Sequence, residues 1–166
     1  MSKTKQTIEL FLSQKNIAVV GVSEAVASRP ANAIFDKLIH AGYNVFVVNP
    51  NLDTYKGQRC YKSLDQISES IGGVMIVTNP GITDTVVDQC LSNGVKHIWI
   101  HNMLGTNVKF GTKLTAKITS VSDKAVEKAR SRGVNVIPGS CPMQYIEPVD
   151  KAHKCIRWFT EMVGNQ

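Results

Sequence analysis

The sequence predicts an α/β fold, a doubly wound three-layer sandwich in which helices cover both faces of a five-stranded parallel sheet. Short β-branched apolar runs alternate with helical patterns along the whole chain. Three times a helical pattern ends in glycine and a strand pattern follows within three residues, at 42–45, 94–95 and 133–134. Apolar runs bounded by turn residues are typical of buried parallel strands. Right-handed crossovers between such strands give a doubly wound sheet.

The apolar runs predict five strands, each of which ends in small or polar residues. They cover roughly 17–22, Asn44–Val48, Val74–Val77, Val95–Ile100 and Val134–Ile137.

Helices are predicted from apolar residues at a spacing of three to four, with Ser or Pro at the start and Gly after the end. They cover 4–14 in a leading segment of 1–15, about 30–41, a short stretch from Ser63, about 81–92, a stretch from Ser122 to Gly133, and 148–163. The last helix has a regular apolar stripe that includes Ile156 and Phe159. Residues 103–120 fit neither pattern and are expected to form a loop or lid.

Composition limits the class of protein. A chain of 166 residues with 43% hydrophobic residues fits one domain with a full core, here 1–166. No apolar run approaches the roughly 18 residues of a membrane helix, and the first residues lack a signal-peptide pattern, so we expect a cytoplasmic protein. The four cysteines form no C-x-x-C pair, so neither a metal site nor a disulfide framework is expected.

The net charge of +6 leaves two interpretations open. The charge indicates either a soluble surface that happens to be basic or a surface that attracts a polyanionic ligand. The Lys and Arg residues are spread along the chain without interleaved aromatics, so nucleic acid is disfavoured. A small ligand with several phosphates fits better.

Residues 16–30 predict a phosphate site. An apolar strand stops at Gly21, small and polar residues follow, and Arg29-Pro30 begins a helix. Unpaired backbone N–H groups and the positive end of a helix dipole favour a phosphate at such a turn. We therefore expect a phosphorylated nucleotide there.

The residues that follow the predicted strands are small or neutral and include no carboxylate. They are Gly21-Val22-Ser23, Asn49-Pro50, Thr78-Asn79-Pro80, His101-Asn102 and Gly139-Ser140-Cys141. Ligands lie at these strand ends in doubly wound sheets, although such residues also make ordinary turns.

Two features argue against NAD. No G-x-G-x-x-G follows the first strand, and the second strand ends in Asn49-Pro50 where a carboxylate usually holds the ribose hydroxyls. Lys56 and Arg59 follow shortly afterwards, so charge alone predicts that one of them reaches an extra phosphate on the adenosine.

In this order, the motifs resemble the CoA-binding domain family. They are I-A-V-V-G-V-S at 17–23, S-R-P-A-N at 28–32, A-G-Y-N-V-F-V-V-N-P at 41–50, G-Q-R-C-Y-K-S-L at 57–64 and V-M-I-V-T-N-P at 74–80. The family is Rossmann-like and includes the nucleotide-binding part of the succinyl-CoA synthetase alpha subunit as well as small free-standing proteins.

The resemblance implies roles for named residues. The CoA pyrophosphate would lie against Gly21, Val22 and Ser23, beside Arg29 as the family's basic residue. Asn49 and Pro50 would border the adenosine, and the other side would be lined by Thr78, Asn79 and Pro80. His101 stands where the family usually has Gln, and 103–120 looks like an insertion, so the mouth of the site is expected to differ.

Two residues are weighed as catalytic candidates. His101 ends a strand at the ligand edge, and Cys141 follows Gly139-Ser140, but no activating partner is evident for either side chain. A hydrogen-bonded wall histidine and a packed loop cysteine are the favoured interpretations, so no catalytic residue is predicted.

The leading hypothesis is a protein that binds CoA or an acyl-CoA without catalysing a reaction alone. A subunit or relative of an NDP-forming acyl-CoA ligase is the first alternative, and an NAD(H)-responsive regulatory module is the second. Trp158, Phe159 and Met162 are expected in the core or in the seam of a homodimer.

Overall fold

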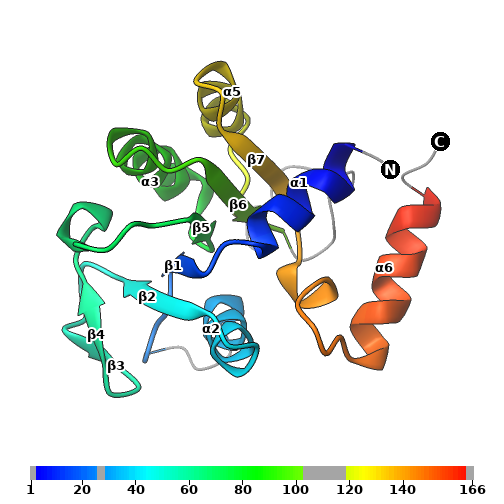
Figure 1. Cartoon of the computed structure of the whole chain (residues 1–166), viewed down its shortest axis with the longest axis horizontal. Coiled ribbons are helices and arrows are strands. Elements are labelled where there is room, and N and C mark those ends of the chain that lie inside the picture. The colour runs from blue at the N-terminus through cyan, green and yellow to red at the C-terminus, as the bar shows by residue number, and fades with distance from the viewer. Residues whose placement is uncertain (1–2, 26–28, 103–118, 164–166) are drawn as a thin grey trace.

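The computed structural model describes residues 3–25, 29–102 and 119–163. Its centre is a seven-stranded sheet in the order β3-β4-β2-β1-β5-β6-β7 (Figure 1). The strands are β1 (Asn16–Val20), β2 (Asn44–Val48), β3 (Thr54–Tyr55), β4 (Gln58–Tyr61), β5 (Gly73–Ile76), β6 (His97–His101) and β7 (Asn135–Ser140). The helices are α1 (Lys3–Leu12), α2 (Pro30–His40), α3 (Pro80–Ser92), α5 (Asp123–Ser131) and α6 (Lys151–Val163), with short 3₁₀ turns η1 (Leu64–Gln66) and η2 (Pro142–Gln144).

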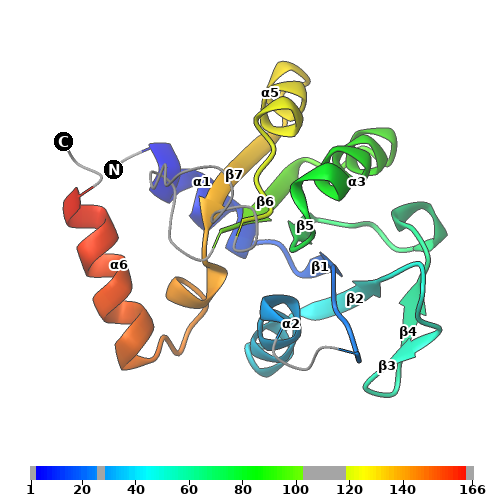
Figure 2. The same cartoon turned by 180° about the vertical axis from the view of Figure 1, so that it is seen from behind.

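The three-layer sandwich is confirmed. Alternate residues of β1 face opposite sides of the sheet, so Ile17 and Val19 join one buried cluster while Ala18 and Val20 join the other. The first cluster includes residues of α1 and α2, and the second includes residues of α3 and α5. The two views show these helix pairs on opposite faces of the sheet (Figures 1 and 2).

All five predicted strands are present and parallel, as β2, β1, β5, β6 and β7. The predicted number of strands was too small, because a hairpin of β3 and β4 extends the sheet beyond β2. Lys56 and Gly57 form its two-residue turn with φ of 49° and 78°. Positive φ at both positions is typical of the turns that match the twist of a hairpin.

The order in which strands are added to the sheet changes direction at β1, because β2 to β4 lie on one side of it and β5 to β7 lie on the other. This strand pairs in parallel with β2 on one side and with β5 on the other. The carboxyl ends of the parallel strands meet at one edge, and the turns after β1 and β5 diverge there to opposite faces. Ligands of doubly wound sheets lie at such a switch point.

The C-terminal helix departs from expectation in one respect. It begins at Lys151 rather than at 148, and its apolar stripe does not enter the core. Ile156 and Phe159 are 42% and 57% exposed. Val149, which precedes the helix, is buried.

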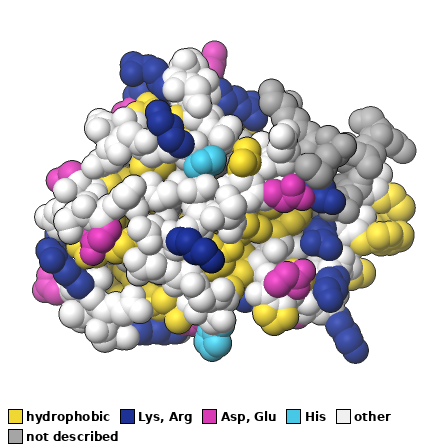
Figure 3. All heavy atoms as spheres, in the orientation of Figure 1, with side chains coloured by type: hydrophobic (Ala, Val, Ile, Leu, Met, Phe, Trp, Pro, Cys, Tyr) yellow, Lys and Arg dark blue, Asp and Glu magenta, His cyan; other side chains and the backbone are white. Residues whose placement is uncertain are grey.

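Most of the predicted loop or lid over 103–120 lies outside the described residues. At its end, Thr119 pairs with Asn102 in an isolated antiparallel bridge, and the Ser120 N–H donates to the His101 carbonyl at 2.8 Å. None of the helices in the described ranges is long and apolar enough to cross a membrane. On the face in Figure 3, Lys and Arg side chains are dispersed among acidic ones.

Candidate functional site

A cavity of about 660 Å³ opens at the carboxyl ends of β1, β2 and β5. This volume is in the range of sites that hold small organic ligands. The lining comes from the turns after these strands, from the start of α2, from the residue after β4 and from one face of α3. The lining residues are Val20–Ala25, Arg29, Val48–Leu52, Lys62, Thr78, Asn79, Ile82, Thr85, Val86 and Gln89.

Gly21 lies at the point where the wall of the cavity meets the neighbouring strand. Its φ of +116° is in a region that L side chains rarely adopt. A Cβ atom at this position would lie 2.2 Å from the carbonyl oxygen of Val77, directly after β5. The glycine is therefore required by the packing of two strand ends, independently of any ligand.

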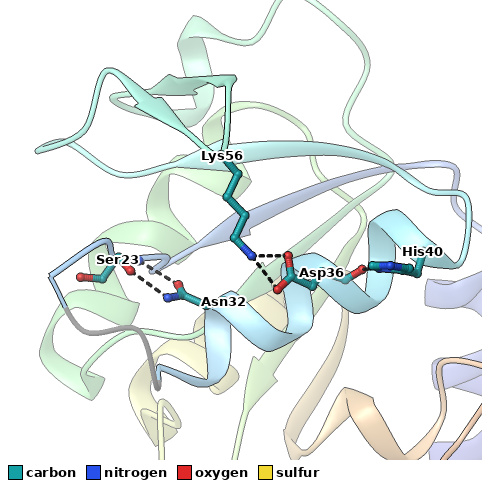
Figure 4. A network of polar contacts seen from close by, with 5 residues as sticks. All are labelled: Ser23, Asn32, Asp36, His40 and Lys56. Atoms are coloured by element: carbon teal, nitrogen blue, oxygen red, sulfur yellow. Dashed lines mark hydrogen bonds and ion pairs between the residues drawn. The ribbon is translucent and has the colours of Figure 1, made fainter.

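Asn32 fixes the turn that follows Gly21. Its Nδ2 donates to the Ser23 carbonyl at 2.8 Å, and its Oδ1 accepts from the Ser23 N–H at 3.0 Å (Figure 4). Asn32 is 7% exposed and lies in the first turn of α2. It thus holds the Ser23 backbone against the start of the helix. The N–H groups at this helix end have no capping side chain in the described part of the chain, and such groups attract phosphate.

Asn49 joins the turns after β1 and β2. Its Nδ2 donates to the Val22 carbonyl at 2.7 Å, and its Oδ1 accepts from the Asn51 N–H at 2.8 Å. The first hydrogen bond requires an amide, since a carboxylate at this position could accept from the Asn51 N–H but would have no N–H to donate to Val22. Asn49, which stands where an NAD site usually has an acidic residue, therefore connects two of the turns that form the cavity.

The cation supplied to the cavity near the end of β2 is Lys62. Its Nζ lies 2.7 Å from Asp53 Oδ1 and donates to the Leu52 carbonyl at 2.8 Å. Lys62 holds the pKa of the Asp53 carboxyl below its usual value. Arg29 is a second cation in the lining, and Glu24 is an exposed carboxylate at the same wall.

The two basic residues that charge alone favoured lie on the β3–β4 hairpin and do not line the cavity. Lys56 binds both oxygens of Asp36 on α2 at 2.6 and 2.7 Å (Figure 4). The Arg59 guanidinium stacks 4.7 Å from the centre of the Tyr61 ring. Sequence proximity could not separate them from Lys62, because the hairpin that turns them away was not predicted.

The far wall combines the turn after β5 with α3. Thr78 and Asn79 line it, while Pro80 only begins the helix. Thr78 Oγ1 lies 3.1 Å from Thr83 Oγ1, which donates to the Ser120 carbonyl at 2.7 Å. This hydrogen-bonded chain anchors the start of α3 beside the strand ends.

Ile82 at the start of α3 lines the cavity and is 51% exposed. It lies one turn before the buried Val86, past the end of the sheet that covers the rest of that face. Gln89 and Leu52 are further lining residues that the sequence did not single out. Ile82 and Gln89 are seven residues apart, which places them on the same face of α3.

The two catalytic candidates lie away from the lining. His101 is 3% exposed, and burial lowers its pKa from 6.5 to about 4, so its ring is neutral at pH 7. Burial raises the pKa of the Cys141 thiol, which keeps it protonated. The neutral ring of His101 is a weak base that is buried away from the cavity, and the protonated thiol of Cys141 is not an activated nucleophile.

The arrangement defines a class of protein, a doubly wound α/β domain with a nucleotide-sized cavity at its switch point. Comparison with known families narrows the class, because a family model of the CoA binding domain matches residues 15–147. The chain belongs to the CoA binding domain family.

The individual proteins that match the chain share low sequence identity with it. The chain is 28% identical over 82 residues to the ADP-forming acetate–CoA ligase of Methanocaldococcus jannaschii, a match that spans 49% of this chain and only 12% of that protein. A hypothetical protein from Pyrococcus horikoshii OT3 has a solved structure with a TM-score of 0.73, 26% identity, and coverage of 89% of this chain and 92% of that one. The dinucleotide-forming acetyl-coenzyme A synthetase 1 of Ca. Korarchaeum cryptofilum shares the fold at a TM-score of 0.62 and 24% identity, over 80% of this chain and 27% of that one.

Proposed function

We propose that this chain binds coenzyme A or an acyl-CoA in the cavity at the carboxyl edge of the sheet, and that it catalyses no reaction alone. The observation that carries the proposal is the position of the cavity, at the switch point beside β1 and inside the range matched by the family. The pyrophosphate would lie against residues 21–23 and Arg29, at the start of α2.

The cavity supports a place for the adenosine between the turn after β2 and α3. Leu52 and Ile82 offer apolar surface there, and Asn49 with Pro50 forms the adjoining wall. An adenine ring is flat and largely apolar on its faces, so it suits a slot with aliphatic sides and polar ends.

We assign recognition of the 3′-phosphate to Lys62 in place of Lys56 or Arg59. Lys62 is the basic residue after β2 that lines the cavity, and its side chain is 40% exposed. A hydrogen bond to a charged group contributes about 1.5 kcal/mol or more, roughly tenfold in affinity. NAD carries no 3′-phosphate, and Asn49 offers no carboxylate for free ribose hydroxyls.

Calorimetric titration with CoA, 3′-dephospho-CoA and NADH tests the assignment. Wild-type protein should bind CoA roughly tenfold tighter than dephospho-CoA, with NADH weaker than both. Lys62→Gln should lower the affinity for CoA and leave the affinities for 3′-dephospho-CoA and NADH unchanged. The matched control is Lys56→Gln, because Lys56 is also ion-paired but does not line the cavity, and it should change none of these affinities. Tighter binding of NADH than of CoA would refute the proposal and favour the NAD(H)-responsive module.

A role beside an acyl-CoA ligase is the second candidate, supported by the partial match to the Methanocaldococcus enzyme. In that case the chain would supply CoA binding to a catalytic partner. The chain incubated alone with acetate, ATP and CoA should release no ADP. If ADP is released when this chain is the only protein present, and not when the chain is left out, the chain is itself an enzyme.

A further inference from the structure

Helix α6 presents its apolar side to the exterior and its polar side to its own domain. Trp158, Phe159 and Met162 are 63%, 57% and 51% exposed. No described side chain of this helix is buried. Hydrophobic side chains stand at the edge of the molecule where α6 lies (Figures 1 and 3). The usual orientation of an amphipathic helix on a core is thus reversed.

The contacts of the polar side hold the helix in this orientation. Arg157 Nη1 donates to the Gln144 carbonyl at 3.1 Å, and its guanidinium lies 5.6 Å from the centre of the Tyr145 ring. At 3.6 residues per turn, His153 projects from the same side as Arg157, and Phe159 projects from the opposite side. His153 is held by Asp150, with 2.6 Å between Nδ1 and Oδ2. Rotation of α6 to bury the aromatics would break the contacts of Arg157 with Gln144 and Tyr145.

We propose that this outer face of α6, formed by Ile156, Trp158, Phe159 and Met162, is the seam of a homodimer in which it packs against the same face of a second copy. With roughly 150–250 Å² per aromatic side chain, the four residues leave about 400 Å² of apolar surface open, a patch of the size that marks interaction sites. Two such faces with their flanking residues bury about 1,000 Å², the lower bound of a specific interface.

The chemistry of the face fits a protein partner better than a lipid surface. Aromatic residues and Met are enriched in the centres of protein interfaces, where charges are rare. A helix that lies on a membrane uses cations of its polar side to reach lipid phosphates. Of the cations of α6, Arg157 is bound to the chain's own domain, whereas Lys151 and Lys154 are exposed, so vesicle binding is measured as an alternative below. A twofold seam of identical helices is the simplest closed arrangement.

The proposed seam is distant from the cavity. Helix α3, one face of which lines the cavity, lies on the side of the molecule opposite to α6 (Figures 1 and 2). Dimer formation would leave both cavities open, so this inference does not depend on the proposed function.

Sedimentation equilibrium between about 1 and 100 μM tests the seam, over a span where interfaces of this size associate. The wild-type chain should approach twice its mass of 18.2 kDa. The double variant Trp158→Ser/Phe159→Ser should associate at least roughly 30-fold more weakly, as expected for the loss of central interface residues. The control Ile39→Ser removes a 37%-exposed residue of α2 and should leave association unchanged.

Alkylation supplies a second measurement on the unaltered protein. Cys155 is exposed on α6, whereas Cys60, Cys90 and Cys141 are buried. Its reaction with iodoacetamide should slow as the wild-type concentration rises, and it should stay constant in the double variant. A wild-type chain that remains a monomer throughout, a double variant that still dimerises, or a monomer that instead sediments with phosphatidylcholine–phosphatidylserine vesicles would overturn the proposal.

Discussion

Gly21 serves two purposes at a single position. Its missing side chain admits the carbonyl of Val77 from the next strand end, and its backbone forms the wall where a phosphate is proposed. Loss of ligand binding in a Gly21 variant would therefore not by itself identify a phosphate contact, because the same change disturbs the packing of β1 against β5.

We predict that Gly21→Ala lowers the free energy of unfolding by at least about 2 kcal/mol, from the combined cost of a positive φ and a Cβ clash. Urea denaturation measures this loss. The control is Gly81→Ala in the first turn of α3, where a Cβ meets nothing within 4 Å, so stability should be kept or slightly raised. Equal stability of the two variants would contradict the strand-end explanation.

His101 provides a prediction about pH. Its pKa is lowered from 6.5 to about 4 because burial disfavours the charged ring. As the pH falls through this window, the unfolded chain takes up a proton that the folded chain does not, so stability is lost on acidification. The largest loss from this group is about 3 kcal/mol.

Denaturation of wild-type protein and His101→Gln between pH 7 and pH 4.5 checks the prediction. The wild type should lose more stability over this range than the variant, because Gln does not titrate. His97, whose pKa is also lowered by burial, contributes equally to both proteins and cancels in the difference. Identical pH dependence would show that His101 titrates normally.

At the scale of elements, hydrogen bonds between turns and helices shape the cavity. Asn32 of α2 holds the Ser23 turn, and Asn49 ties that turn to the one after β2. Neither contact involves a charge, so the shape should be insensitive to salt. We expect these amides to matter more than the exposed ion pairs around them.

Asn32→Ala should lower the free energy of unfolding by about 2 kcal/mol and weaken CoA binding, because the Ser23 N–H and carbonyl both lose their partner in a partly buried turn. Asp36→Ala, one turn later on α2 (Figure 4), removes an exposed pair with Lys56 and should cost at most about 1 kcal/mol. Thermal and chemical denaturation compare the two variants. A larger effect at Asp36 than at Asn32 would reverse the expected ranking.

The sequence predicted the five parallel strands because each is an uninterrupted apolar run, buried on both faces as in Ile17–Val20. It missed β3 and β4 because they are short, polar strands in which only Tyr55 and Cys60 are buried. It found α6 but left its apolar residues open between the core and a homodimer seam, since periodicity identifies an apolar face without saying what covers it.

At the scale of the whole molecule, the sheet edge carries the candidate site. The sequence singled out Gly21 to Ser23, Asn49, Pro50, Thr78 and Asn79 at strand ends and Arg29 at the start of a helix, and all of them line one cavity. Lys62 and Ile82 could not be predicted, because their position depends on the hairpin and on where α3 extends past the sheet. Lys56, Arg59, Pro80 and His101 lie outside the lining for the same reason: proximity in sequence or at a strand end does not fix the direction of a side chain.

The most direct test of the central claim is a crystal structure of the chain grown with saturating CoA. The adenosine diphosphate portion should occupy the cavity, with its pyrophosphate at residues 21–23 and its 3′-phosphate within reach of Lys62 Nζ. An empty cavity at saturating CoA, or CoA bound elsewhere on the molecule, would contradict the account.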